Sequence, residues 1–181
     1  GETDTVETKT GTFKLTGTPI ANSEFSGADF ITVTMSLVIN AKTATASMTD
    51  SPSGVGSVTF GEDYSSQTDT FKITTNANAN ITIPTSLLIT QGDFEIISIT
   101  ESNGVYTYTY KITAGVSAGA KSATYEVTVN ADTNSKFDGL ALNASKTIDV
   151  SLSGTVTPKA TALTLSPTTL NFGENDQNAE V

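Results

Sequence analysis

The sequence contains no cysteine, no histidine and no tryptophan, and the first two absences exclude whole classes of chemistry. Without cysteine there is neither a disulfide framework nor a thiolate metal site. Without histidine as well, the chain lacks the commonest nucleophile, the commonest general base and the best ligands for transition metals. Carboxylate pairs such as Asp93 and Glu95 remain for glycosidase-like chemistry, but acids beside hairpin turns usually face water. The sequence therefore predicts a protein that is not an enzyme.

Positive charge is scarce too, because nine basic residues stand against 19 acidic ones, for a formal net charge of -10. Phosphate backbones are bound by clustered Lys and Arg, so nucleic acid is not an expected partner. No apolar run approaches the roughly 18 to 20 residues of a membrane span, so we expect no spanning segment. An acidic, well-solvated surface is typical of secreted proteins, and we predict an extracellular or cell-surface location.

Threonine, serine and asparagine are abundant, and they alternate with aliphatic residues. Threonine favours strands because its branched side chain is stiff, whereas asparagine and glycine mark turns. The clearest alternation covers residues 31–39, which predicts a central, half-buried strand. About ten such segments at short spacing, without a convincing helix, predict an all-β fold, an immunoglobulin-like β-sandwich of antiparallel strands.

Two segments predict hairpins. Asn103 and Gly104 stand between alternating strands, and such a pair favours the tight turn that needs positive φ at both positions. Residues 58–83 begin with a short strand that ends at Phe60 and Gly61, followed by an acidic turn and a second alternating strand. This opening recurs at residues 170–175, which indicates a repeated module.

These patterns divide the chain into three parts. Residues 1–50 hold extra N-terminal strands, which either extend the main sandwich or form the tail of a preceding module. Residues 51–158 make the sandwich itself. Residues 159–181 are a linker and the first strand of a following, truncated module. That orphan C-terminal strand, residues 162–172, would reach roughly 36 Å, far enough to dock on its own sheet in cis or on a neighbouring subunit in trans.

The order of these elements resembles a known family. The phrases that carry the resemblance are Phe60-Gly61, Thr70-Phe71-Lys72-Ile73, Gly92-Asp93-Phe94-Glu95-Ile96, Leu152-Ser153-Gly154-Thr155 and Leu165-Ser166-Pro167-Thr168-Thr169-Leu170-Asn171-Phe172-Gly173. They are similar to immunoglobulin-like repeats of the ASH and BACON types in Bacteroidetes-type surface and secreted multi-domain proteins. The resemblance covers roughly residues 51–157 and 162–181, leaving residues 1–50 outside it. It implies a bacterial spacer, adhesion module or glycan-associated accessory domain.

Two groups of residues are candidate sites. Tyr106, Tyr108 and Tyr110 share one face of a predicted strand, where they either fill the core or form an exposed stripe for a glycan. Asp132, Asn134 and Asp138 place oxygen ligands at alternating positions, as a calcium loop does. Lys136 occupies the position of a further ligand, however, and no glutamate follows at the twelfth position, so a solvated loop is the competing interpretation.

The sequence thus predicts a non-enzymatic β-sandwich module serving adhesion or acting as a structural spacer. One alternative is a self-assembling, fimbria-like pilus or filament subunit that uses a terminal donor strand. Another is a carbohydrate-binding module. The expected partners are other copies or neighbouring modules of the same protein, and a glycan or host surface. No cofactor is predicted, and calcium is the one candidate ion.

Overall fold

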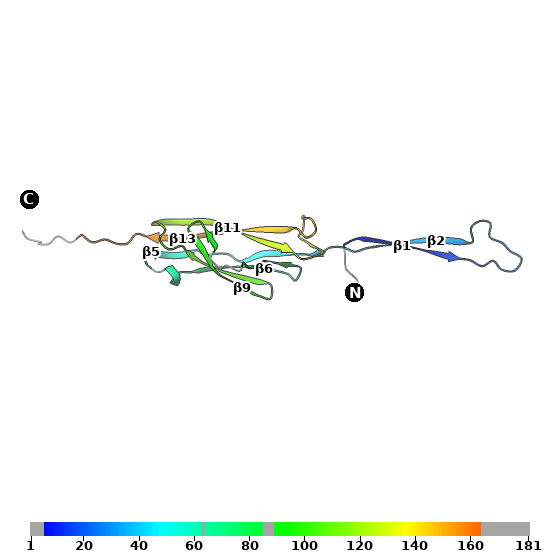
Figure 1. Cartoon of the computed structure of the whole chain (residues 1–181), viewed down its shortest axis with the longest axis horizontal. Coiled ribbons are helices and arrows are strands. Elements are labelled where there is room, and N and C mark those ends of the chain that lie inside the picture. The colour runs from blue at the N-terminus through cyan, green and yellow to red at the C-terminus, as the bar shows by residue number, and fades with distance from the viewer. Residues whose placement is uncertain (1–5, 63, 85–88, 164–181) are drawn as a thin grey trace, which may run out of the picture.

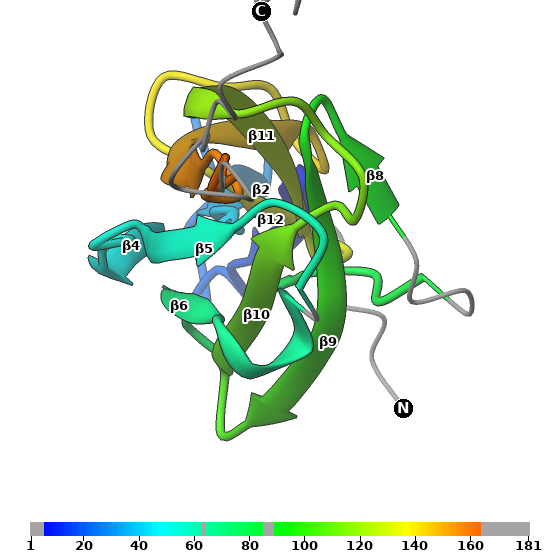
Figure 2. The same ribbon diagram turned by 90° about the vertical axis from the view of Figure 1, so that its left-hand side faces the viewer.

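The alternating segments form strands throughout the computed structural model, which describes residues 6–62, 64–84 and 89–163. Most of the strands build two layers, and an N-terminal hairpin extends from one end of them (Figure 1). Viewed along the long axis, β6, β9 and β10 lie on one side and β11 on the other (Figure 2). The predicted all-β class is confirmed.

The first layer is a five-stranded sheet, and the second has four strands. In sheet order the first contains β4 (Ala46–Asp50), β6 (Asp69–Thr75), β10 (Val105–Ile112), β9 (Phe94–Ser102) and β8 (Ile89–Gln91). The second contains β5 (Val55–Thr59), β13 (Ser145–Thr157), β11 (Gly119–Ala131) and β7 (Ala79–Asn80). Neighbours are antiparallel in both, except that β5 runs parallel to β13. Two facing sheets of mainly antiparallel strands are consistent with a β-sandwich.

The hairpin predicted for residues 58–83 is wrong, because β5 and β6 belong to different sheets. A short 3-10 turn, η1 (Tyr64–Ser66), lies between them, and the Tyr64 side chain is buried in the core. This connection carries the chain from one sheet to the other, so β5 and β6 lie in opposite layers instead of pairing. Alternation alone could not distinguish these arrangements, since both bury one face of each strand.

The hairpin predicted at Asn103 and Gly104 is confirmed by the pairing of β9 with β10. Both turn residues have positive φ, 52° and 77°, as the tight turn requires. The Gly104 amide also donates a hydrogen bond to Glu101 Oε1 at 2.8 Å.

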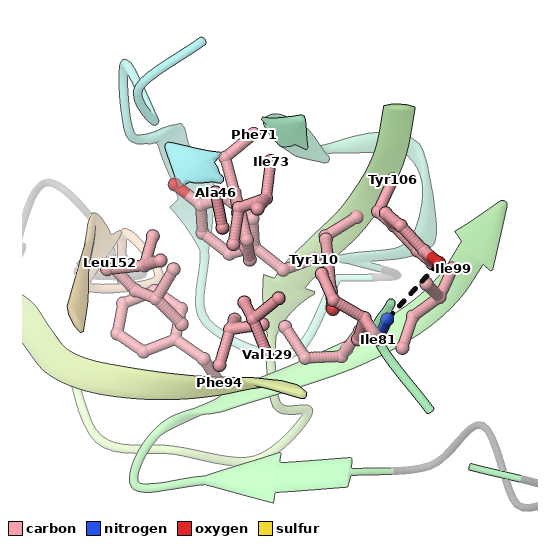
Figure 3. Close-up of a cluster of buried hydrophobic side chains, with 14 of the residues drawn as sticks. Ala46, Phe71, Ile73, Ile81, Phe94, Ile99, Tyr106, Tyr110, Val129 and Leu152 are labelled. Carbon is pink, nitrogen blue, oxygen red and sulfur yellow. Dashed lines mark hydrogen bonds between the residues drawn. The ribbon is translucent and has the colours of Figure 1, made fainter. Parts of the chain in front are cut away.

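The core lies between the two sheets and is rich in aromatic rings. Phe71 of β6 stacks on Tyr108 of β10 with ring centroids 4.6 Å apart. The rings of Phe94 and Tyr110 pack edge to face, with their centroids 5.9 Å apart. Val129 and Leu152 of the opposite layer contribute aliphatic side chains to the same cluster (Figure 3). Offset and edge-to-face ring contacts add to the hydrophobic gain of burying such large side chains.

The N-terminal hairpin consists of β1 (Thr8–Thr16) and β2 (Phe30–Val38), which pair with each other alone among the described residues. It continues into a small parallel pair, β3 (Lys42–Thr43) with β12 (Ser135–Lys136), at the end of the sandwich. The central, half-buried strand predicted for residues 31–39 is therefore wrong: β2 is exposed along most of its length. Alternation shows that a strand has two chemically different faces but not what covers them.

One strand of the predicted N-terminal part, residues 1–50, belongs to a sheet of the sandwich. The sandwich begins with β4 at Ala46, before residue 51, because β4 pairs with β6. The predicted strand at 162–172 and the echo at 170–175 lie outside the described residues, apart from Ala162 and Leu163. Leu163 is fully exposed.

Candidate interaction surface

The three tyrosines of β10 point into the core and do not form an exposed stripe. The exposed fractions of Tyr106, Tyr108 and Tyr110 are 7%, 1% and 0%. Thr107 and Thr109, which alternate with them, occupy the outer face of the sheet. Burial in the interior leaves no tyrosine face for a sugar, so the stripe that a carbohydrate-binding module would need is absent at these positions.

Two of these hydroxyl groups hold neighbouring segments in place. Tyr106 Oη accepts a hydrogen bond from the Ile81 amide at 3.2 Å, which fixes the chain that follows β7 (Figure 3). Tyr110 Oη donates to Asp69 Oδ2 at 2.9 Å. Burial raises the pKa of Tyr108, Tyr110 and Tyr125 above that of an exposed tyrosine.

Asp69 collects several donors at the start of β6. Its carboxylate accepts from the Gly54 amide at 2.7 Å and from Ser53 Oγ at 3.1 Å, in addition to Tyr110. Partial burial opposes ionisation of this side chain, but the donated hydrogen bonds, which include the Thr70 backbone, outweigh it. The pKa of Asp69 therefore lies below its usual value of 3.8. This cluster is a structural joint between the β4–β5 connection and the core.

Two of the calcium candidates, Asp132 and Asn134, take part in hydrogen bonds within the protein. Asp132 Oδ1 accepts a hydrogen bond from the Asn80 side chain, and its carbonyl accepts from the Ser135 amide at 2.9 Å. The Asn134 amide donates to Asn143 Oδ1 at 2.8 Å, and Asp138 lies exposed further along the loop. The described residues contain no group of three or more acidic, His or Cys side chains that could hold a metal ion. Polypeptide groups organise the loop at Asp132 and Asn134.

The carboxylate pair suggested for acid–base chemistry is divided between two lysines. Lys111 Nζ lies 2.9 Å from Glu95 Oε1, and Lys121 Nζ lies 3.3 Å from Asp93 Oδ2. The two acids therefore form separate ion pairs instead of sharing a site. Among the described residues, no helix has the length and apolar character to cross a membrane.

The N-terminal hairpin exposes apolar side chains and unpaired strand edges, and we call it the β1–β2 ribbon. Its register places side chains in cross-strand pairs that alternate between two faces. One face carries, from base to tip, Lys9 with Leu37, Gly11 with Met35, Phe13 with Val33, and Leu15 with Ile31. We call this the apolar face. The other face carries mainly Thr, Ser and Lys14, with Phe30 at the tip end and Val38 at the base.

Side chains of the apolar face are unusually open to solvent. Phe13, Leu15, Ile31, Met35 and Leu37 are 45% to 65% exposed, and Val33 is half-buried. Contiguous exposed apolar surface of this kind marks interaction sites in soluble proteins. The outer edges of β1 and β2 are also unpaired among the described residues, so their backbone groups can accept another strand.

The base of the ribbon is tied to the sandwich by backbone and amide hydrogen bonds. The Thr43 carbonyl accepts from Asn76 Nδ2 at 2.8 Å and from Asn78 Nδ2 at 3.0 Å. The Thr45 amide donates to Asn76 Oδ1 at 3.1 Å. The Lys42 amide adds a bond to the Asn134 carbonyl at 2.9 Å, so the ribbon is attached through an ordered connection.

Sequence reasoning did not identify this surface, although a signal was present. The alternation of residues 31–39 predicted a buried face, and Phe13 and Leu15 of the preceding strand supply a matching one. Together they predict an amphipathic ribbon, but only the tertiary structure shows that no other part of the described chain covers it. None of the family models, curated proteins or solved structures with which the chain was compared matches it.

Proposed function

We propose that this chain is a non-enzymatic, extracellular or cell-surface β-sandwich module that acts as a structural spacer. The observation that carries this proposal is that the chain enters and leaves the sandwich at opposite ends. Lys146, near the start of β13, donates to the Ala46 carbonyl at the start of β4, at 3.2 Å. The strand then runs thirteen residues and ends at the other end of the sandwich (Figure 1). Neighbouring segments would be separated by roughly 40 Å.

The pairing of the last strand suits a spacer under tension. β5 and β13 are parallel, with Val55 opposite Gly154 and Thr59 opposite Thr157. A pull on the entering and leaving segments slides these strands along each other, so their hydrogen bonds are loaded together and not one after another. The Phe60 amide donates to the Thr157 carbonyl at 2.9 Å, and Thr157 Oγ1 donates to the Val58 carbonyl at 3.1 Å, at the end of this ladder.

Single-molecule pulling on the full chain between its termini tests the role. Phe60→Pro removes the amide that bonds Thr157, whereas Phe60→Ala keeps it and loses the same partly exposed ring. We expect Phe60→Pro to unfold at a clearly lower mean force than Phe60→Ala. Equal forces for the two variants would contradict a role for the β5–β13 ladder in bearing tension.

A second candidate is a filament subunit that receives a terminal donor strand. Two observations favour it: the open edges of the β1–β2 ribbon, and the full exposure of Leu163 just beyond the sandwich. The residues around Leu163 could add as a donor strand to an open edge of another copy. Electron microscopy should then show filaments that Leu163→Lys abolishes and Ala162→Lys retains. Wild-type protein that forms no filaments would eliminate this candidate.

A further inference from the structure

The apolar face of the β1–β2 ribbon is complementary to itself. It consists of four cross-strand pairs. The smallest residue, Gly11, and the largest, Phe13, belong to the two middle pairs and are adjacent on this face of β1. On β2 the corresponding positions hold Met35 and Val33. Consider a two-fold axis that runs parallel to this face, perpendicular to the strands, and passes between the two middle pairs. This axis places the Phe13 ring of one copy over the space above Gly11 of the other.

We propose that this face packs against the same face of a second copy of the chain, with the two ribbons antiparallel. In this arrangement β1 crosses β1, and Phe13 of each copy lies over the partner's Gly11. Met35 then lies over the partner's Val33. The result is a small four-stranded sandwich in which each ribbon supplies one layer, at the usual separation of about 10 Å between packed sheets.

Gly11 is not required by the chain's own conformation. Its backbone does not lie in the left-handed region, and a Cβ at this position would meet nothing within 4 Å. A glycine inside a strand weakens it and commonly marks a place where another group approaches closely. In the isolated ribbon no such group is present, whereas the two-fold arrangement brings a phenylalanine ring to this position.

Charge selects the antiparallel orientation. Lys9 is the one charged residue of the apolar face, and Glu7 lies 3.3 Å from its ammonium group. Parallel packing would place β1 of each copy over β2 of the other, so the two Lys9 side chains would lie at the same level of the interface, each over the partner's Leu37. The antiparallel arrangement places Lys9 over Leu15 and Ile31 at the partner's tip, where the lysine stem can cover apolar surface. The opposite face is unsuited, because it is mainly Thr and Ser and its Lys14 already lies 4.1 Å from the Phe30 ring.

The size of the face sets the strength of this contact. Two strands about 4.8 Å apart and nine residues long offer roughly 300 Å² per copy, well below the area of standard stable interfaces. The association is therefore weak and concentration-dependent. It also stabilises the ribbon, because an isolated two-stranded hairpin is only marginally stable in water. It goes beyond the spacer role and differs from strand donation, since it uses the face of the ribbon and not its edges.

Sedimentation velocity of the full chain, from about 10 µM to 1 mM, should show a rise from monomer toward dimer. Val33→Lys places a charge in the apolar face and should weaken association at least about tenfold. Thr34→Lys, its neighbour on the other face, should leave association unchanged. A wild-type mass that stays monomeric over the whole range overturns the proposal.

Gly11→Leu separates this arrangement from general stickiness. The substitution enlarges the apolar surface and raises strand propensity, so nonspecific association would increase. In the two-fold arrangement the new side chain occupies the space of the partner's Phe13, so association should fall. Stronger dimerisation of Gly11→Leu would refute the proposed packing. Dimerisation that Leu163→Lys abolishes and Val33→Lys leaves intact would also refute it, in favour of strand donation.

Disulfide cross-linking tests which residues of the two copies lie opposite each other, and it needs only one cysteine substitution in each apolar face. The chain has no native cysteine, so a mixture of Val33→Cys and Met35→Cys proteins can form a disulfide only between the introduced thiols. We expect mixed dimers to form faster than either homodimer, since residue 33 lies over the partner's residue 35. Thr34→Cys should remain unlinked at the same concentration. Equal rates for all pairs would contradict the register.

Discussion

The Tyr110 hydroxyl donates a hydrogen bond of 2.9 Å to Asp69 Oδ2, joining the centre of the aromatic core to the first connection of the sandwich. Tyr110 is completely buried, whereas Asp69 is partly exposed. The same carboxylate oxygen accepts from the Gly54 amide at 2.7 Å. The connection that carries the chain from β4 to β5 is thereby attached to β6 and, through Asp69, to β10 of the five-stranded sheet.

Tyr110→Phe should destabilise the fold by about 1–2 kcal/mol. The ring still fills its place, but Asp69 loses a donor, and hydrogen bonds to charged groups contribute more than neutral ones. Urea unfolding monitored by circular dichroism measures the change. Ser53→Ala, which removes a longer and more exposed bond to the same carboxylate, serves as the milder control. Equal stability of Tyr110→Phe and wild type would show that the bond contributes nothing.

Asp69 should make stability depend on pH in the acid range. Its pKa is lower in the folded protein than in the unfolded chain, so the folded state favours the ionised form. The contribution is present above the unfolded value, near 3.8, and is lost as the pH falls through the lower folded value. The wild-type advantage over Asp69→Asn should therefore be largest at neutral pH and shrink below about pH 4. A constant difference from pH 7 to pH 2 would contradict this assignment.

Gly104→Ala should be among the most damaging single-atom changes in the sandwich. Gly104 has φ of 77°, and a Cβ there would lie 2.6 Å from the Thr75 carbonyl oxygen. We expect a loss of about 2–3 kcal/mol, from backbone strain and the displaced neighbour, measured by thermal or urea unfolding. Asn103→Gly, at the other turn position, keeps positive φ accessible and should change stability by less than about 1 kcal/mol.

Asn76→Ala should loosen the base of the ribbon. The side chain bonds the Thr43 carbonyl and the Thr45 amide, and it also accepts from the Asn78 amide. We expect faster hydrogen exchange at the Thr45 amide and a loss of about 1–2 kcal/mol. Asn78→Ala removes a single side-chain bond to the same Thr43 carbonyl and should have the smaller effect. Unchanged exchange at Thr45 would show that Asn76 does not hold this connection.

Local chemistry explains which predictions are confirmed. The Asn103–Gly104 turn was predictable because it depends on backbone conformations that these two residues favour. The strands of the sandwich were predictable from alternation, because each buries one face. The predicted β5–β6 hairpin was wrong because the connection with the buried Tyr64 ring crosses from one sheet to the other, and alternation does not show which sheet a strand joins. The exposed tyrosine stripe required these rings to be open to solvent, and spacing along the chain does not encode which face of a strand is covered.

By itself, the sequence determined the all-β class, the positions of most strands and the absence of cysteine and histidine chemistry. These follow from residue types and from local conformational preference. Only the tertiary structure decided that the β10 tyrosines face inward, that β5 pairs with β13, and that no other part of the described chain covers the apolar face of the β1–β2 ribbon. The physical reason is that alternation specifies two different faces for every strand, whereas burial depends on what the rest of the chain places against them.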